Sequence, residues 1–340
     1  MRGVGQGRRE WGVLAAVAVL AAAWVQAAPS TAVRHDAARV SMGCLWEIEA
    51  WAPEGGETAA ALERALDEVD RLDRLLSHYR PDSGLSRLNR DGASGPVAVD
   101  RELFALIRTS LEYSRAWDGA FDITVGPLMR AWGFFRGEGR VPDASTLETA
   151  RARVGFRHIR TDAERQTVAF DVDGLQLDFG AIGKGYAADR AAEVLRKAGI
   201  EAALVNGCGS TMAAIGAPPG ASGWKIPLRD PLRRDALAMT VTLRDRTLSV
   251  SGGDEQWFER DGVRYSHIMD PRTGRPVAGV LMVVVLAPTA TDADALSTAV
   301  FVAGPEESRR RLAGLSGVEA HVFVPAGDGW RAIRLGGGAD

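Results

Sequence analysis

LQLDFGAIGKGY, residues 175–186, joins a predicted strand to a predicted helix that ends near Gly199. Its three glycines let the backbone approach a ligand closely and expose N–H groups at the start of the helix. Such a junction suits a phosphate group, and Lys184 would add a positive charge. The segment matches neither a Walker A loop nor the Rossmann G-x-G-x-x-G pattern. A plain tight turn with a solvated Lys184 is the alternative interpretation.

The chain around and after this junction is rich in predicted strands. A hairpin is expected to pair residues 169–170 with residues 175–179 and to turn at Asp173 and Gly174. A helix over residues 293–303 should stop at Gly304 and Pro305. Apolar and alternating runs predict further strands near residues 202–206, 211–215, 238–243, 247–250, 265–268, 280–287, 318–324 and 330–334.

The N-terminal part of the chain favours helices after a first strand. Apolar side chains alternate from Val40 to Ile48, which predicts one half-buried strand. Leucines at helical spacing predict an amphipathic helix over about residues 59–77, and the polar residues 80–95 predict a loop.

Two further helices are marked by their first residues. Asp100 is expected to cap a helix that ends near Asp118 and Gly119. Residues 145–148, S-T-L-E, form a capping box for a short helix that stops at Gly155. Helices grouped early and strands grouped late predict an α+β fold with mixed β-sheets, packed helices and two interlocked lobes.

Composition excludes several classes of protein. The chain has 340 residues with a formal net charge of −3, 46% hydrophobic and 25% charged, as in ordinary globular proteins. This charge provides no basic field, so no nucleic-acid partner is expected. Two cysteines rule out a disulfide-rich scaffold, and five histidines without H-E-x-x-H argue against a zinc hydrolase of that type.

Residues 1–27 have the features of a secretory signal peptide. Three arginines precede an uncharged run over residues 11–25, and small residues follow, with a cleavage site expected after Ala27. An uncleaved membrane anchor is the alternative, although an anchor needs roughly 20 apolar residues and this run is shorter. Export is therefore expected, with residues 28–340 as the mature domain and membrane contact only through a retained leader.

A carboxylate and a hydroxyl share one face of the predicted helix near its start. Asp294 and Thr298 are four residues apart, which places their side chains on neighbouring turns. Both offer hard oxygen atoms, the ligands that Mg²⁺ prefers. The alternative is that Asp292 or Asp294 caps the helix.

Two more segments contain candidate functional residues. His267 lies at the end of a predicted strand, where a loop could present it as a general base; a hydrogen-bonded structural histidine is the alternative. In the segment that begins at Ala120 and Phe121, Asp122 and Thr124 could serve either a site or a turn, within an otherwise apolar core segment.

Together these segments resemble the ApbE family, the FAD:protein FMN transferases. The resemblance runs in order through nearly all of the mature chain, and the collinear order of its pieces is more specific than any one of them. The matching pieces are Met42–Gly43, residues 76–83 with Leu88 and Asn89, residues 121–128, residues 178–189, Ser251 and Gly252, residues 267–274, and residues 293–299.

The resemblance implies a T-fold-like core with the ligand site between two lobes. It implies an enzyme that binds Mg²⁺ and takes FAD as substrate, transferring the FMN moiety to a Thr or Ser hydroxyl of an exported redox-complex subunit and releasing AMP. It also implies a periplasmic location. An FAD pyrophosphatase and a non-catalytic periplasmic flavin-binding protein are the alternatives.

The family pattern also assigns site residues in this sequence. Residues implied to line the FAD site are Met42, Tyr79, Ala120, Phe121, Asp122, Asp178, Lys184 and Ile268. The metal is assigned to Asp294, Thr298 and the backbone carbonyl of Ala181. Some members carry a second Asp where this chain has Ser297, so Ser297 is a further candidate ligand.

Two departures from the family pattern are cysteines. Cys44 stands where Thr is common, and Cys208 interrupts a common Gly-Gly pair, so both are expected near the flavin. An oxidising compartment permits a disulfide between them, but two free thiols are the favoured expectation.

The expected chemistry is an in-line displacement at the FAD diphosphate. Mg²⁺, Lys184 and loop N–H groups would neutralise the phosphate charge. His267 is the candidate base for the acceptor hydroxyl, with Asp294 or a metal-bound hydroxide as alternatives.

Overall fold

The structure is a computed structural model that describes residues 32–233, 235–253 and 255–337. The predicted leader, residues 1–27, lies outside these residues, so its prediction stays untested. In the described part of the chain, no helix combines the length and the apolar character that crossing a bilayer requires.

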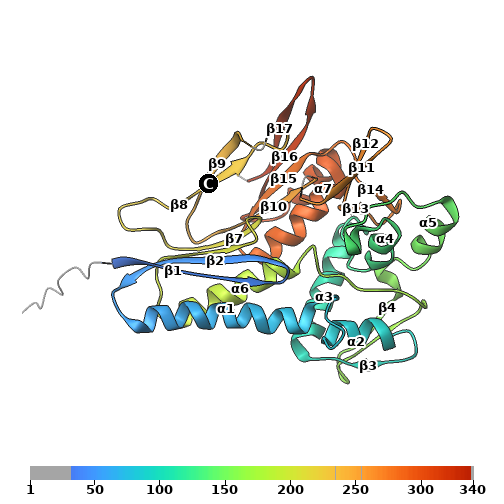
Figure 1. Ribbon diagram of the computed structural model, residues 1–340, viewed down its shortest axis with the longest axis horizontal. Helices are drawn as coiled ribbons and strands as arrows, with labels where there is room; N and C mark the ends of the chain where they lie inside the picture. The colour runs from blue at the N-terminus through green and yellow to red at the C-terminus, as the bar shows by residue number, and fades with distance from the viewer. Residues whose placement is uncertain (1–31, 234, 254, 338–340) are drawn as a thin grey trace, which may run out of the picture. The chain divides into compact units, whose positions relative to one another are not determined.

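The largest sheet of the described residues has eight strands in the order β1-β2-β6-β7-β10-β15-β16-β17 (Figure 1). Each neighbouring pair is antiparallel, which confirms the α+β class although mixed strand directions were expected. The strands are β1 (Ala32–Ser41), β2 (Cys44–Pro53), β6 (Ala203–Gly207), β7 (Thr211–Ile215), β10 (Thr247–Gly252), β15 (Met282–Ala287), β16 (Glu319–Ala326) and β17 (Gly329–Gly336).

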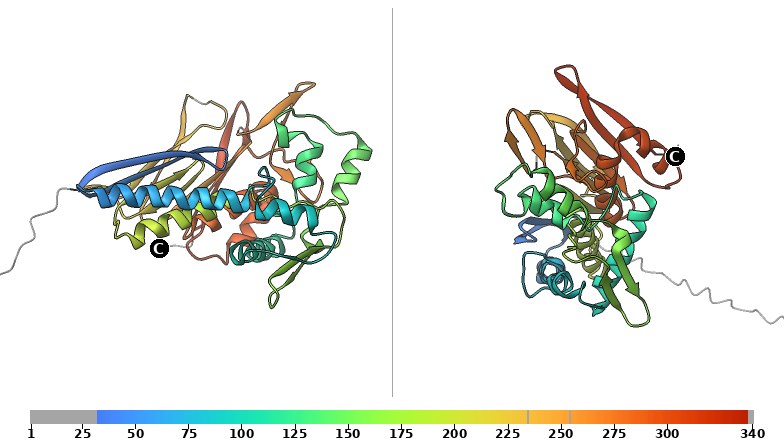
Figure 2. Two further views of the ribbon diagram at one scale, coloured as in Figure 1. Left: turned by 60° about the horizontal axis from the view of Figure 1, so that its bottom comes forward. Right: turned by 90° about the vertical axis from the view of Figure 1, so that its right-hand side faces the viewer.

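Helices cover one face of this sheet, and a separate hairpin covers the other (Figures 1 and 2). Because side chains alternate along a strand, Val283 and Val285 of β15 join the helix-side core while Val284 joins the hairpin-side core. The hairpin consists of β8 (Trp224–Arg229) and β9 (Leu237–Leu243); β9 was expected and β8 was not.

The helices that matter for the site are long, and shorter ones surround them. The long helices are α1 (Gly56–Leu76), α3 (Arg101–Ala116), α6 (Gly183–Lys197) and α7 (Ala290–Leu312). The short ones are α2 (Gly84–Asp91), α4 (Gly126–Ala131), α5 (Ala144–Arg151), η1 (Phe134–Arg136) and η2 (Phe156–His158). Small sheets complete the described fold: β3 (Val97–Ala98) with β5 (Thr167–Phe170) and β4 (Ile159–Asp162), β11 (Trp257–Arg260) with β12 (Val263–Ser266), and β13 (Met269–Asp270) with β14 (Arg275–Pro276).

The first strand is a hairpin rather than the single strand expected from Val40 to Ile48. Ser41 pairs with Cys44, and the two residues between them, Met42 and Gly43, have φ of 50° and 79°. Two consecutive positive φ values are typical of the tight turns whose twist matches a hairpin. The turn reverses the alternation, so Val40 is 73% exposed beside Leu45 whereas Trp46 and Ile48 are buried.

The loop expected over residues 80–95 contains helix α2. The Ser83 hydroxyl accepts a hydrogen bond from the Ser86 N–H at 2.9 Å and so caps the helix, whose Leu85 and Leu88 are fully buried. Polar residues dominate the segment, but two leucines at helical spacing suffice to anchor one short helix.

The hairpin expected between residues 169–170 and 175–179 is also wrong. β5 pairs with β3 and β4 instead, and the side chain of Asn89 holds the backbone of Leu177 from both sides. Its Nδ2 donates to the Leu177 carbonyl at 2.9 Å, and its Oδ1 accepts from the Leu177 N–H at 2.7 Å. A side chain from α2 thus takes the place of a strand partner.

Two helix boundaries differ from the sequence patterns. Asp143, rather than Ser145, caps α5, because its carboxylate accepts from the Thr146 N–H at 2.7 Å. The helix α7 begins at Ala290, and Gly304 interrupts it with φ of 74° as expected, after which a second helical stretch continues to Leu312. The strand expected over residues 265–268 ends at Ser266.

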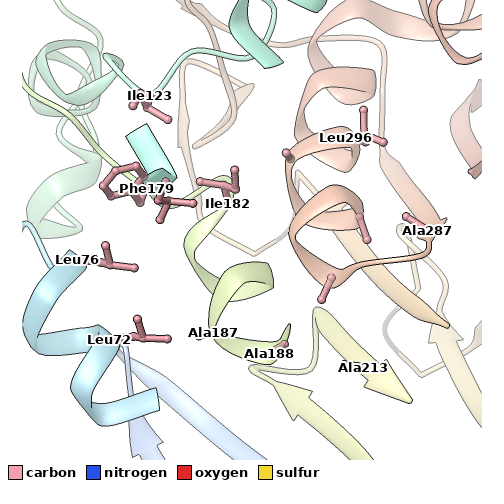
Figure 3. Packing of buried hydrophobic residues seen from close by; sticks show 14 of the residues in the cluster. Leu72, Leu76, Ile123, Phe179, Ile182, Ala187, Ala188, Ala213, Ala287 and Leu296 are labelled. Atoms are coloured by element: carbon pink, nitrogen blue, oxygen red, sulfur yellow. The ribbon is translucent and has the colours of Figure 1, made fainter. Parts of the chain in front are cut away.

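Helix α6 lies between α1 and α7 in the core (Figure 3). Small residues such as Ala187 and Ala188 form its buried face, which allows close packing on both sides. Asp189 accepts hydrogen bonds from the N–H groups of Ala290 and Thr291, each at 2.8 Å, and so secures the start of α7 to the middle of α6.

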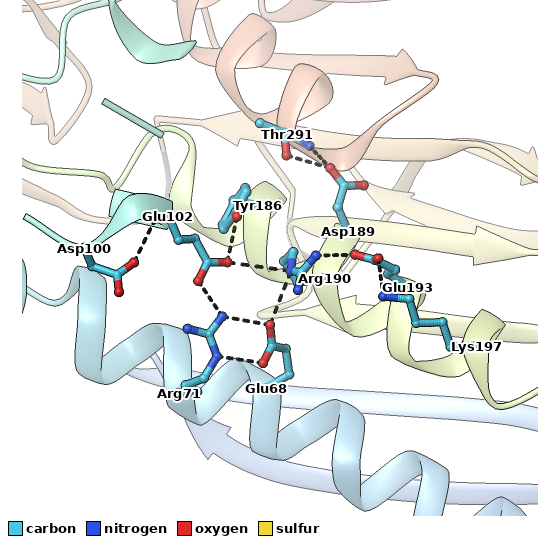
Figure 4. A network of polar contacts seen from close by, with 10 residues as sticks. All are labelled: Glu68, Arg71, Asp100, Glu102, Tyr186, Asp189, Arg190, Glu193, Lys197 and Thr291. Atoms are coloured by element: carbon cyan, nitrogen blue, oxygen red, sulfur yellow. Dashed lines mark hydrogen bonds and ion pairs between the residues drawn. The ribbon is translucent and has the colours of Figure 1, made fainter. Parts of the chain in front are cut away.

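A polar network joins α1, α3 and α6 beside this core (Figure 4). Arg71 donates to Glu68 at 2.8 Å and to Glu102 at 2.6 Å. The Tyr186 hydroxyl donates to Glu102 at 2.7 Å, and Arg190 donates to Glu68 at 3.3 Å. The network holds the polar face of α6 against α1 and α3, and this contact helps to set the orientation of the helix.

Substituting Gly185 by alanine should separate α6 from α7. An added Cβ would overlap the carbonyl oxygen of Ala290 and lie 2.6 Å from Asp294 Cβ. We expect the free energy of unfolding to fall by about 3 kcal/mol, as for an overpacked core. Urea denaturation followed by circular dichroism measures the change. Gly56→Ala is the matched control, because among the described residues no atom lies within 4 Å of a Cβ at Gly56. The stability of this variant should be unchanged or slightly higher. Equal effects of the two substitutions would contradict the close-packing argument.

Candidate functional site

The glycine-rich turn closes on itself before α6 begins. Asp178 is buried, and its Oδ1 accepts from the Gly180 N–H at 2.8 Å, while the Gly183 N–H donates to the Phe179 carbonyl at 2.7 Å. Ile182 at the start of α6 makes no side-chain cap, and the Gly185 N–H of the first turn donates to the Asp294 carboxylate at 2.8 Å. The positive end of the helix dipole at this turn favours an anion.

Lys184 does not point into solvent. Its Nζ donates to the Ser210 hydroxyl at 2.7 Å, in the turn between β6 and β7, and lies 4.0 Å from Glu255 Oε2. The side chain of Lys184 is thus held across the start of α6. The interpretation of a solvated lysine is wrong, and Ser210 is a partner that the sequence patterns did not single out.

Asp294 is a buried carboxylate rather than a helix cap. Its Oδ2 accepts from the Gly185 N–H at 2.8 Å, and its Oδ1 accepts from the Ser249 hydroxyl at 3.3 Å. Thr289 caps α7 instead, by accepting from the Asp292 N–H at 3.0 Å. Burial raises the pKa of Asp294 above its usual value, an effect that the charge of Lys184 partly offsets.

Hydroxyl groups of β10 line the face of α7 that carries Asp294 and Thr298. Ser251 Oγ lies 2.8 Å from Ser297 Oγ and 3.3 Å from Thr298 Oγ1, and Ser297 donates to the Asp294 carbonyl at 2.9 Å. Ser249 and Ser251 lie two apart on the strand and so face the same way. That spacing is the signal by which Ser249 could have been found in the sequence.

These groups fit a small hard cation such as Mg²⁺. Asp294 is 4% exposed, and among the described residues no Lys, Arg or His lies within ion-pair distance of its carboxylate. A buried charge of this kind is normally paired or bound to a metal. Thr298 Oγ1, one helical turn along α7 and 3.3 Å from Ser251 Oγ, adds a hydroxyl oxygen beside this carboxylate. No cluster of three or more His, Cys, Asp or Glu side chains suited to a metal occurs in the described ranges.

An aromatic group borders Asp178 on the other side of the turn. The rings of His78 and Tyr79 lie 4.0 Å apart between centroids, and each lies 4.9 Å from the Phe135 ring. His78 Nδ1 lies 3.5 Å from Asp178 Oδ1, and Tyr79 is 64% exposed. A cavity of about 300 Å³ opens beside them, lined also by Asn89 and Gln176.

Residues 120–122 are buried, and the Asp122 carboxylate is occupied by local bonds. It accepts from the N–H and hydroxyl of Thr124, at 2.8 and 2.7 Å, and from the Phe156 N–H at 2.8 Å. Ala120 and Phe121 are each 1% exposed. Asp122 therefore shapes the turn that supports the site, and burial raises the pKa of its carboxyl group.

His267 and Ile268 lie between β12 and β13. His267 Nδ1 lies 3.2 Å from the carbonyl oxygen of Gln256; because a carbonyl can only accept, Nδ1 carries the proton and Nε2 is the basic nitrogen. Burial lowers the pKa of His267, and the charges of Glu255, Lys184 and Asp178 also act on it. The imidazole is therefore neutral near pH 7 and able to accept a proton.

Met42 and the two cysteines meet near the start of α6. A Cβ at Gly183 would lie 3.7 Å from Met42 Cε, so the methionine at the hairpin tip covers the glycine turn. Cys44 and Cys208 form a disulfide with Cα atoms 5.4 Å apart. The expectation of two free thiols is therefore wrong, because the antiparallel pairing of β2 with β6 brings the two positions together.

Comparison with known proteins shows which family this chain is similar to. The model of the ApbE family matches residues 42–322. Proteins named FAD:protein FMN transferase from Treponema pallidum and Escherichia coli K12 are 36% and 31% identical to this chain, covering 86% of it and 84% of each relative.

Solved structures show the same fold. An ApbE protein from Thermotoga maritima superposes with a TM-score of 0.81 at 30% identity, covering 89% of this chain and 97% of that one. The flavin transferase ApbE from Vibrio cholerae gives 0.80 at 29% identity, with the same coverage.

Replacing Asp294 by asparagine should stabilise the metal-free protein at neutral pH. The folded protein holds this carboxyl at a raised pKa, so its contribution to stability is favourable below the unfolded pKa and is lost as pH rises through the folded pKa. Asparagine keeps an acceptor for the Gly185 N–H without the buried charge.

We expect Asp294→Asn to raise the free energy of unfolding by about 1 kcal/mol or more at pH 7.5, and the gain to shrink as pH falls towards 4. Thermal unfolding in chelator at several pH values measures it. A variant less stable than the original chain at pH 7.5 would show that the charge is compensated within the protein itself.

Proposed function

The chain belongs to the ApbE family, and we propose that it is an exported, Mg²⁺-dependent FAD:protein FMN transferase. It transfers the FMN moiety of FAD to a Thr or Ser hydroxyl of an exported protein and releases AMP. The relatives' shared name supports FAD and a protein as the substrates. The observation that carries the proposal is the convergence of Lys184 and the buried Asp294 on the first turn of α6.

Asp294, Thr298 and the carbonyl of Ala181 would hold the metal ion. When bound, Mg²⁺ supplies a positive charge that offsets the charge of the FAD diphosphate. Lys184 provides a second positive charge, held in place by Ser210. The positive end of the α6 dipole acts in the same direction, so this chain's own groups favour a diphosphate at the glycine turn.

The flavin and adenosine parts of FAD need apolar and aromatic surfaces. Tyr79, stacked with His78 and Phe135, presents an exposed ring for stacking on a flat heterocycle. Met42, which covers Gly183, and the buried Ile268 would supply apolar contacts. Binding by several distant elements would orient the diphosphate, which is the main task of the protein in phosphoryl transfer.

His267 accepts the proton of the acceptor hydroxyl at Nε2. The acceptor oxygen forms a bond to the phosphorus of the FMN half, the bond from that phosphorus to the bridging oxygen breaks, and AMP leaves with the bridging oxygen. The lowered pKa of His267 keeps the imidazole neutral before the reaction, as a base requires.

Export is supported by two independent features. The leader pattern of residues 1–27 directs a chain out of the cytoplasm, and a disulfide such as Cys44–Cys208 persists in oxidising compartments. We therefore place the mature enzyme in the periplasm, where its acceptor, a subunit of a redox complex, would also be located.

The direct test incubates the mature protein with FAD, MgCl₂ and an exported subunit carrying a flavinylation threonine. We expect a fluorescent acceptor band and one AMP per flavin attached, and intact FAD when the acceptor is omitted. FMN and AMP formed at the same rate without acceptor would indicate a pyrophosphatase instead. Bound flavin with no turnover under any divalent metal would indicate a binding protein.

Removing the buried carboxylate should abolish transfer while the fold persists. We expect Asp294→Ala to lower the rate of AMP release at least about 100-fold, because the group that would hold the metal is lost. Chelation of the unmodified enzyme should give the same loss, reversed by added Mg²⁺. Full activity of Asp294→Ala would refute the metal assignment.

Lys184→Ala should weaken FAD binding by about tenfold or more, since a charged group bonded to the diphosphate is removed. Quenching of flavin fluorescence at equilibrium measures the dissociation constant. Lys197→Ala is the matched control: Lys197 lies at the far end of the same helix, is 70% exposed and pairs with Glu193. If both substitutions weaken FAD binding equally, the effect is one of overall charge and not of Lys184.

A further inference from the structure

The Cys44–Cys208 disulfide lies at the end of the β2–β6 ladder. The last paired residues are Trp46 and Gly207, followed by a hydrogen bond of 3.0 Å from the Cys208 N–H to the Leu45 carbonyl. Beyond this bond the two backbones turn apart, towards Met42 on one side and Ser210 on the other. The disulfide therefore links the two turns at the point where the ladder stops.

Both turns contain a non-glycine residue with positive φ, which at Met42 belongs to the tight turn of the β1–β2 hairpin. Met42 has φ of 50° and Cys208 has φ of 64°, in the left-handed region that non-glycine residues rarely occupy. Such conformations persist where the surrounding structure enforces them. Ser210 has further support, since its carbonyl accepts from the Val250 N–H at 2.8 Å. The hairpin tip at Met42 and Gly43 has less, because Gly43 is exposed and has nothing within 4 Å of a Cβ position.

The two turns both reach the start of α6. Met42 covers Gly183 from the hairpin, and Ser210 holds Lys184 from the β6–β7 turn. The distance between these two contacts is set in part by the covalent bond between their flanking residues, Cys44 and Cys208.

We propose that the Cys44–Cys208 disulfide is a positioning device for the flavin site, which makes FAD affinity depend on the oxidation state of this cysteine pair. The inference rests on the proposed function of the glycine turn as an FAD site. The oxidised pair holds Met42 over the turn in its binding position. In the reduced protein the hairpin tip becomes ordered only when FAD binds. Ordering the tip costs free energy, so the affinity for FAD is lower.

The redox step is a two-electron reduction. A phosphine reductant breaks the S–S bond, both sulfurs become thiols, and the phosphine becomes a phosphine oxide with oxygen and protons taken from water. Both cysteines are partly exposed, so a reductant can reach them. A thiol count on the unfolded protein verifies the state of each sample.

The test is an equilibrium titration of FAD against oxidised and phosphine-reduced protein. We expect reduction to raise the dissociation constant about tenfold, equivalent to about 1.4 kcal/mol. Cys44→Ser/Cys208→Ser should bind FAD as weakly as the reduced protein and should not respond to the reductant, which controls for any action of the reductant on FAD. In the transfer assay, reduction should raise the KM for FAD and leave kcat unchanged.

Met42→Ala separates positioning from a general loss of stability. We expect this variant to bind FAD weakly and to lose most of its response to reduction, because the disulfide acts through Met42. A disulfide that only stabilised the fold would lower the melting temperature and leave the dissociation constant unchanged at a temperature far below melting.

Equal affinity of oxidised and reduced protein overturns the proposal, as does a full response to reduction in Met42→Ala. Failure of the proposed function gives a different result, namely no FAD binding in either oxidation state. If the double serine variant does not fold, the reduced protein and Met42→Ala still decide the question.

Discussion

The rest of the site depends on the close approach of α6 and α7 at Gly185. The absence of a side chain there lets the Gly185 N–H reach the Asp294 carboxylate at 2.8 Å. One contact therefore joins the glycine turn, which suits a diphosphate, to the helix that carries the candidate metal ligands. The small residues of α6, the bonds of Asp189 to the start of α7 and the network around Arg190 all maintain this contact from positions outside the site.

Placing a carboxylate at this contact has a cost in stability. Asp294 is buried, and its charge is only partly offset by Lys184, so the protein alone does not favour its ionised form. A bound cation would remove this penalty, which couples metal binding to stability as well as to reactivity. A carboxylate held in this way is expected at a functional position, where a fold tolerates a locally unfavourable group for the chemistry it supplies.

The disulfide between Cys44 and Cys208 is a departure of this chain from the family pattern. The family pattern has other residue types at the positions of these two cysteines. The disulfide fixes the hairpin tip that covers the glycine turn. The site is therefore held from three directions: by α7 through Asp294, by the β6–β7 turn through Ser210, and by the hairpin through Met42. An oxidising compartment suits this construction.

Sequence patterns predicted the features that depend on residues close together along the chain. Most strands and long helices, the placement of Asp294 and Thr298 on one helical face and the glycine turn with Lys184 follow from spacing along a few residues, because period and turn chemistry are local. Tertiary structure alone decided the contacts between distant segments: the pairing of Cys44 with Cys208, the serines of β10 and Ser210 as partners of the site, and Asn89 in place of a strand beside Leu177. These contacts depend on which strands lie side by side and on how closely two helices pack. A pattern within one segment predicts neither the neighbouring strand nor the spacing between helices.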